Sequence, residues 1–248
     1  MDYAYAILQM DPNSIWRSKT ALTVVPVQPS DSWIISKKRY IRHKHPHLLK
    51  RFETIPNIEA MILCYDHIQA FTNATLSVHP SIKQKWKLQY GLNHELFGAF
   101  YNTDLRSTYC TLFPELEAPR GVCNAYTFTP KKGSTYLANP PYTSGWIKWT
   151  IRSILDKWRS SHWIIVIPVW DASTRKKYGL SAQPPLVEID ELLAVVPASQ
   201  RKVETKFLFY DGYSDKTAIL RDPIHVIFCF SSTEPLPVAV ESSLVPSS

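Results

Sequence analysis

Apolar side chains recur along this chain at two periods, one typical of strands and one typical of helices. Residues 162–170 form a nearly continuous β-branched run, as expected of a central parallel strand that is covered on both faces. From Ser144 onward, apolar residues return at helical spacing, which predicts an amphipathic helix with Ser144 as its N-cap. The expected inner stripe of this helix consists of Ile147, Ile151, Ile154, Leu155 and Trp158, with Lys148, Arg152 and Arg159 off the stripe.

Shorter runs predict the remaining elements. Strands are expected at Tyr136–Ala138, Val122–Phe128, Lys206–Tyr210 and His225–Phe230, with a loop at Tyr210–Tyr213, and helices at Thr103–Phe113 and Pro80–Leu88. Ala21–Val27 and Trp33–Ile35 favour strands or extended segments, whereas Glu59–Phe71 fits a helix and a strand equally well. Strands and helices alternate and a strand pair ends the chain. We therefore expect a Rossmann-like α/β fold of three layers with a mainly parallel sheet.

Length and composition narrow the class of protein. The 248 residues, 45% of them hydrophobic, are enough to bury a full core in one domain with at most a small appended region. Only 7 glycines stand against 19 prolines, which nearly excludes Gly-rich phosphate loops. No apolar run approaches the length of a membrane span, and residues 1–20 lack a signal-peptide pattern. We expect no membrane contact and an intracellular protein, in the nucleus or the cytoplasm.

Cysteine and histidine spacing gives no metal site. Cys64, Cys110, Cys123 and Cys229 are widely spaced and form no CxxC pair, which favours buried thiols in a reducing compartment. His43, His45 and His47 alternate, but no carboxylate or cysteine stands near them in the sequence. We expect polar or phosphate-facing histidines and no bound metal.

The net charge of +7 and the pI near 9.1 favour an anionic partner, with nucleic acid first. The densest basic run carries no acidic residue and has Tyr40 interleaved, a pattern suited to a phosphate backbone with one stacked base. Its alternative is an ordinary solvated face. The basic residues of this run, expected to contact RNA, are Lys37, Lys38, Arg39, Arg42, Lys44, Lys50 and Arg51.

The stretch with the clearest chemistry is Asn139-Pro140-Pro141-Tyr142, between a predicted strand and the helix from Ser144. Two prolines make a stiff turn, and a strand-to-helix turn is where α/β sheets hold ligands. The Asn139 side-chain oxygen and the Pro140 carbonyl can accept both hydrogens of an exocyclic amino group, while Tyr142 stacks on the base. An ordinary Asn-Pro turn is the alternative.

Five motifs in order extend this picture: Glu95-Leu96-Phe97-Gly98-Ala99-Phe100-Tyr101-Asn102, Tyr109-Cys110-Thr111-Leu112-Phe113-Pro114, Arg120-Gly121-Val122-Cys123, Asn139-Pro140-Pro141-Tyr142 and Ile167-Pro168-Val169-Trp170. Over roughly residues 88–230 the chain resembles the cap-specific adenosine N6-methyltransferase family, that of the phosphorylated-CTD-interacting factor. It departs from that family in having Phe100-Tyr101 where the family has Ser-Pro, Tyr142 in place of Phe, no WW domain and a short N-terminal region.

The resemblance implies a class I methyltransferase fold, S-adenosylmethionine as cofactor and capped mRNA as substrate. It implies a catalytic clamp at Asn139, Pro140, Pro141 and Tyr142. The cofactor contacts it implies are Glu95, Phe97, Gly98, Ala99, Asn102, Thr127 and Asn139, with Thr127 standing where an acidic ribose ligand is expected. The implied domains are an RNA-binding extension over 1–87, a catalytic domain over 88–230 and a mobile Pro/Ser-rich tail over 231–248. Such a short version would suit a virus, and then the cytoplasm, or a divergent unicellular eukaryote.

The expected reaction is methyl transfer to the N6 amine of the first transcribed adenosine, which needs positioning more than a strong base or a metal. Three alternatives stay open. One is an adenine methyltransferase for internal RNA or DNA, or a glutamine methyltransferase, since these also carry NPPY. The second is a non-catalytic RNA-binding subunit with the same fold. The third is a catalytic subunit that needs a protein partner to recognise the cap.

Overall fold

The computed structural model describes residues 2–17, 30–73, 75–103, 108–179, 185–220 and 222–231. The chain divides into two compact units, each built from three separate segments. Unit 1 comprises residues 1–77, 96–129 and 210–216, and unit 2 comprises 78–95, 130–209 and 217–248. Neither unit follows the expected boundary at residue 87, because the segment 96–129 packs with the N-terminal helices. The strand expected at Ala21–Val27 and the tail from residue 232 lie outside the described residues.

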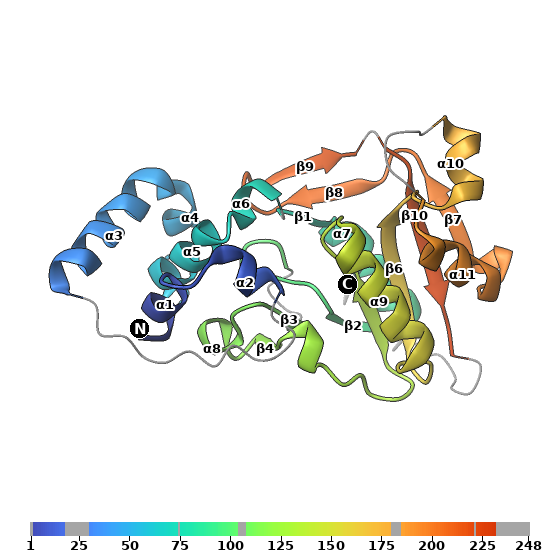
Figure 1. Cartoon of the computed structure of the whole chain (residues 1–248), viewed down its shortest axis with the longest axis horizontal. Helices are drawn as coiled ribbons and strands as arrows, with labels where there is room; N and C mark the ends of the chain where they lie inside the picture. The colour runs from blue at the N-terminus through green and yellow to red at the C-terminus, as the bar shows by residue number, and fades with distance from the viewer. Residues whose placement is uncertain are drawn as a thin grey trace, which may run out of the picture. The chain divides into compact units, whose positions relative to one another are not determined.

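Unit 1 is mainly helical (Figure 1). Its elements are α1 (Asp2–Ile7), α2 (Pro12–Arg17), α3 (Asp31–Lys44), α4 (Pro46–Arg51), α5 (Ile58–His67), α6 (Ala70–Asn73), β3 (Thr108–Cys110), α8 (Pro114–Glu117), β4 (Gly121–Cys123) and the 3₁₀ helix η1 (Ala125–Thr127). Helix α5 contacts α1, α3, α4, α6 and α8 and buries six of its ten residues. A helix apolar on nearly all sides belongs in a core, which settles the helix-or-strand ambiguity of Glu59–Phe71.

Three expectations for unit 1 are wrong. Trp33–Ile35 lies in α3, because the Ser30 side chain caps that helix by accepting from the Trp33 N–H. Thr108–Cys110 is a strand, in place of the expected helix, and pairs in parallel with β4. The strand expected at Val122–Phe128 ends at Cys123, because the Asn124 side chain accepts from the Tyr126 N–H and starts η1.

The sheet of unit 2 has the strand order β2 (Leu92–Glu95), β5 (Thr135–Ala138), β6 (His162–Pro168), β10 (Ile224–Cys229) and β7 (Arg201–Glu204). Strands β2, β5 and β6 are parallel, while β10 is antiparallel to both of its neighbours. Every residue of β6 is buried, as its continuous apolar run predicted. The expectation of an α/β fold with a mostly parallel sheet is confirmed at this level.

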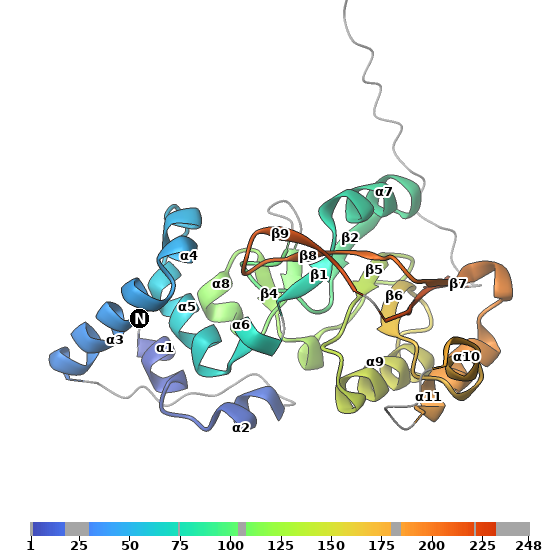
Figure 2. The same cartoon turned by 90° about the horizontal axis from the view of Figure 1, so that it is seen from above.

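Helices cover both faces of this sheet. Helix α7 (Pro80–Tyr90) lies on one side, and α9 (Ser144–Asp156) and α11 (Val187–Val195) lie on the other, which gives three layers (Figure 2). The inner stripe of α9 is buried at Ile147, Ile151 and Ile154, as expected, but its N-cap is Thr143 instead of Ser144. The remaining elements of unit 2 are α10 (Ala172–Tyr178) and the 3₁₀ helix η2 (Ala198–Gln200).

A second, three-stranded sheet has the order β1 (Leu76–Val78), β8 (Leu208–Asp211) and β9 (Lys216–Ile219). Strand β8 covers most of the predicted strand 206–210, so the two strands expected at the end of the chain lie in different sheets. Among the described residues, no helix has the length and apolar character needed to cross a membrane.

Candidate functional site

The loop Asn139–Tyr142 leaves the carboxyl end of β5, whose four residues are all buried. Asn139 and Tyr142 are half-buried and Pro140 is buried. The Thr143 N–H donates to the Pro141 carbonyl at 2.7 Å, and the Thr143 hydroxyl accepts from the Trp146 N–H at 3.4 Å to cap α9. A buried strand and a capped helix therefore fix both ends of this loop, as the sequence predicted.

Within the loop, the Tyr142 hydroxyl donates to Oδ1 of Asn139 at 3.2 Å. Burial raises the pKa of Tyr142, so this hydroxyl stays a protonated donor. The Tyr142 ring meets Phe209 edge to face, with centroids 6.4 Å apart. The hydrogen bond from the Tyr142 hydroxyl orients the Asn139 amide, and the amide oxygen keeps a second lone pair that can accept from a ligand. Sequence reasoning gave Tyr142 only a stacking role, because it could not place the phenol against the amide.

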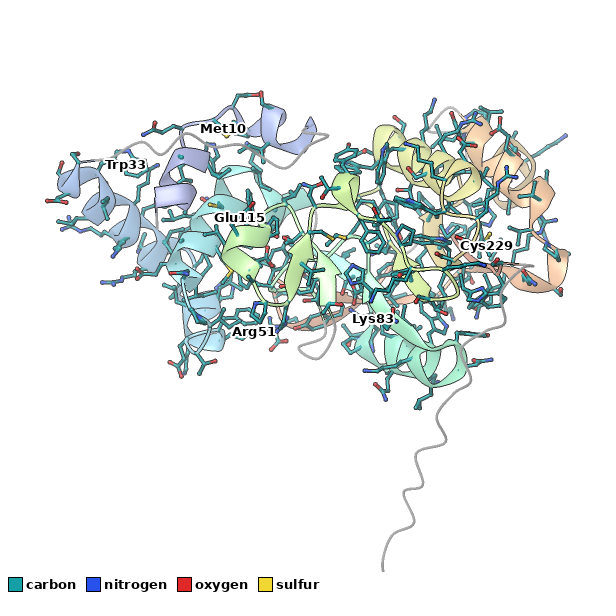
Figure 3. The ribbon with its side chains drawn as sticks, turned by 90° about the horizontal axis from the view of Figure 1, so that it is seen from below. Met10, Trp33, Arg51, Lys83, Glu115 and Cys229 are labelled. Carbon is teal, nitrogen blue, oxygen red and sulfur yellow. The ribbon has the colours of Figure 1, made fainter. Side chains whose placement is uncertain are left out.

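Glu95 and Asn139 lie at the same edge of the sheet. Their strands, β2 and β5, are parallel neighbours in which Glu95 pairs with Leu137, two residues before Asn139. The Glu95 carboxylate is buried and already bound within the protein: Nζ of Lys83, a residue of α7 labelled in Figure 3, lies 2.6 Å from Oε1. Because a buried ion pair is costly to break, Lys83 holds Glu95 in one position. The sequence gave no sign of this partner.

The other predicted cofactor residues belong to unit 1, and four of them share one turn. The Ala99 N–H donates to Oδ1 of Asn102 at 3.0 Å, and the Gly98 N–H donates to the Cys110 carbonyl at 2.8 Å. A Cβ at Gly98 would lie 2.7 Å from Cβ of Tyr109, so packing against β3 itself requires glycine here. Phe97 is half-buried and Ala99 buried in the same turn.

Thr127 does not occupy the expected position. It is exposed in η1, and its hydroxyl donates to the Asn124 carbonyl at 3.1 Å. The premise that Thr127 follows the end of a strand is wrong, because β4 ends at Cys123.

A buried carboxylate that the sequence did not single out organises the surroundings of this turn. Glu117 accepts hydrogen bonds from the hydroxyls of Tyr65, at 2.5 Å, Tyr109, at 2.8 Å, and Thr111, and from the Phe100 backbone N–H. Burial raises the pKa of Glu117 above its usual range, although each of these donors lowers it. The network ties the turn that holds Phe100 to β3 and α5. No local signal marks Glu117, since its donors come from three separate segments and the farthest, Tyr65, lies in α5.

Acidic residues neutralise much of the basic run. Lys38 and Arg42 pair with Glu59, and Lys44 pairs with Asp66. Arg51, labelled in Figure 3, donates to the Gly212 carbonyl at 2.8 Å and pairs with Asp215.

The rest of the run differs in exposure and partners. Lys37 lies over the Trp33 ring, with Nζ 5.4 Å from its centroid, and Arg39 and Lys50 are exposed. The sequence run lacks acids, but the fold supplies them from α5 and from the turn after β8.

His45 has a structural role in unit 1. It is buried, with one ring nitrogen 3.0 Å from Oδ1 of Asp66 and the other 3.1 Å from the Tyr213 hydroxyl. Burial raises the pKa of Asp66, but hydrogen bonds from His45, Lys44 and Tyr40 outweigh it and lower the pKa to about 2. His45 therefore faces a carboxylate of the fold, in place of the phosphate expected from sequence.

Cys110 and Cys123 are opposite residues at the carboxyl ends of β3 and β4, and their sulfurs lie 2.7 Å apart. Neither forms a disulfide, and burial raises the pKa of Cys110. Two thiolates form a donor pair for a soft metal ion. Wide spacing in the sequence concealed this pair, because a parallel strand pairing brings its members together.

No protein-family model matches the chain, and no curated protein matches it significantly. The resemblance to the cap-specific methyltransferases rests on the five sequence motifs alone.

Proposed function

We propose that the protein is an S-adenosylmethionine-dependent adenine N6-methyltransferase that acts on RNA, at the first transcribed adenosine next to the cap. The observation that carries the proposal is the Asn139–Tyr142 loop at the carboxyl end of a buried parallel strand, with Glu95 at the end of the neighbouring strand. In open α/β sheets, ligands bind outside the carboxyl ends of the strands.

In this proposal the loop positions the adenine amine. Its two hydrogens donate to Oδ1 of Asn139 and to the Pro140 carbonyl, which directs the nitrogen lone pair toward the methyl donor. The Tyr142 hydroxyl, 3.2 Å from Oδ1, keeps the amide oxygen in place, and the Tyr142 ring offers a stacking face. Orientation of this kind supplies roughly 7–11 kcal/mol in well-oriented reactions.

The residues at this edge fit the proposed cofactor. S-adenosylmethionine, when bound, supplies the methyl group. In unit 2, the Glu95 carboxylate at the end of β2 suits its polar groups, although Oε1 of Glu95 is shared with Lys83.

The test is methyl transfer from labelled S-adenosylmethionine to four matched substrates: RNA capped with adenosine first, uncapped RNA, RNA capped with guanosine first, and DNA. We expect transfer to the capped adenosine RNA alone. Transfer to uncapped RNA or DNA would keep the chemistry and remove the cap from the proposal.

The variant Asn139→Ala should abolish this turnover with little change in cofactor affinity, because it removes an amine acceptor and leaves the strand ends intact. Near-wild-type rates in Asn139→Ala would contradict the clamp.

One observation favours a second candidate, a non-catalytic RNA-binding subunit. Glu95 forms an ion pair with Lys83, and Oδ1 of Asn102 accepts from the Ala99 N–H. These internal contacts leave both side chains fewer atoms with which to bind a cofactor. Calorimetric titration of S-adenosylmethionine separates the candidates, since only the enzyme should bind it. If the protein binds the cofactor but transfers no methyl group, a protein partner that supplies cap recognition becomes the favoured explanation.

A further inference from the structure

Four tryptophans of unit 2 form a continuous series of ring contacts. Trp146 meets Trp149 edge to face with centroids 5.9 Å apart, and Trp149 meets Trp158 in the same way at 5.7 Å. Trp158 stacks on Trp163, with centroids 5.1 Å and planes 17° apart. Trp163 in turn contacts Tyr136 of β5, the strand that carries Asn139. The series therefore links the strand of the proposed clamp to the first turn of α9.

The two ends of this series differ in burial. Trp158 and Trp163 are 7% and 0% exposed and belong to the core. Trp146 and Trp149 are half-buried and lie off the inner stripe of α9, which is formed by isoleucines. Packing in the core accounts for the first pair, whereas part of each outer indole faces solvent.

Trp146 also lies close to the clamp along the chain. It is the third residue of α9 and comes four residues after Tyr142. Side chains of a helix lean toward its N-terminus, so the Trp146 indole leans toward the end of α9 that joins the loop. Its contact with Trp149 limits its rotamers, so little freedom remains to be lost when a ligand stacks on it.

Indole rings at such a position suit an unpaired nucleobase. Every base has a π-face, and stacking on aromatic side chains is the main sequence-tolerant contact of proteins with single-stranded nucleic acid. Charge contributes less here, because Lys148 and Arg152 of the same helix pair with Glu188 and Glu191 of α11.

We propose that Trp146 is a stacking platform for a base that flanks the target adenosine in single-stranded RNA, with Trp149 holding it in place. This inference rests on the proposed function for the identity of the target, but base stacking itself can be measured without methyl transfer. Trp146 is thus a substrate-positioning residue outside the clamp, and neither the motifs nor the resemblance assigns it this role.

The test compares Trp146→Ala, Trp146→Leu and Trp146→Phe in the full chain by fluorescence anisotropy with a short labelled single-stranded RNA. We expect the alanine and leucine variants to weaken binding about tenfold, and phenylalanine to retain most of the affinity. Leucine keeps apolar volume but has no π-face. A purely structural role would therefore be served by leucine and phenylalanine alike, and equal affinities for these two variants would overturn the proposal.

Two further measurements separate this inference from the proposed function. In methyl-transfer assays, Trp146→Leu should raise KM for RNA with little change in kcat. An unchanged KM with an active wild-type enzyme would overturn the stacking role and leave the function intact. If the wild type transfers no methyl group, the anisotropy measurements alone decide whether Trp146 stacks on an RNA base. Duplex RNA, whose bases already stack, should bind equally well to wild type and Trp146→Leu; a loss equal to that for single strands would contradict base stacking.

Discussion

At the scale of residues, the proposed clamp contains one contact that the motif does not imply. The Tyr142 hydroxyl donates to the same Asn139 oxygen that would accept from the substrate amine. An amide oxygen has two lone pairs, so both hydrogen bonds can form together. The hydroxyl therefore orients the acceptor, which a phenylalanine at this position could not do.

Tyr142→Phe tests that role. Removing one hydrogen bond of about 0.5–1.5 kcal/mol should lower kcat two- to tenfold, because the Asn139 amide becomes free to rotate. Tyr142→Ala should lose far more activity, since it also removes the stacking face. Steady-state methyl transfer measures both variants, with cofactor affinity as the control. A faster Tyr142→Phe enzyme would show that the hydroxyl competes with the substrate instead.

At the scale of elements, polar contacts join segments that the hydrophobic pattern leaves unrelated. Lys83 of α7 holds Glu95 of β2, and Asp66 of α5 holds Lys44 and His45 at the junction of α3 and α4. Glu117 does the same for β3, α5 and the turn around Phe100. Such networks specify one arrangement of elements only when every donor has its acceptor.

Glu117→Gln tests this network through pH. The folded-state pKa of Glu117 is raised above its usual value of 4.5, so the folded protein holds this proton more tightly than the unfolded chain. Its contribution to stability is fully present below pH 4.5 and is lost as pH rises through the folded-state pKa.

Glutamine cannot ionise, so the variant should show a flatter dependence of unfolding free energy on pH over that window. Denaturant unfolding at a series of pH values measures it. Parallel curves for wild type and variant would refute the assignment. Glu117→Ala should cost more than about 2 kcal/mol at any pH, because it leaves buried hydroxyls without an acceptor.

At the scale of the whole molecule, the net charge of +7 favours binding to an anionic partner such as RNA. In unit 1, however, much of the basic run forms ion pairs within the protein. Exposed ion pairs of this kind add little to the stability of the fold. They also reduce the net positive charge of the run that an RNA phosphate would meet. Arg39 and Lys50 are exposed members of the run and should contribute most to any RNA contact.

Reversing those charges gives the corresponding prediction. Arg39→Glu and Lys50→Glu should each weaken RNA binding and reduce the slope of log affinity against log salt concentration by about one. Lys202→Glu is a matched control with the same change of charge, since Lys202 is exposed in unit 2 and pairs with Glu204 at 2.7 Å. If all three variants weakened binding equally, either the RNA would contact another surface or the loss would follow from the change in net charge alone.

The sequence by itself determined the features that depend on neighbours along the chain. The continuous apolar run of β6, the inner stripe of α9 and the rigid Asn-Pro-Pro turn between β5 and α9 were all predictable, because period and proline act locally. Local patterns also predicted the α/β class. They failed for Thr108–Cys110 and Val122–Phe128, where a strand partner and a side-chain cap outweighed propensity.

Only the tertiary structure decided which polar groups meet. It placed Glu95 beside Asn139 on neighbouring strands, paired Glu95 with Lys83, and brought Cys110 to Cys123 and four tryptophans into one series. Glu95 and Asn139 are far apart in the sequence, and Lys83, the cysteines and Trp158 meet their partners across turns and between elements. Their proximity depends on strand order and helix packing, which bury apolar area and carry no local signal for the polar groups they bring along.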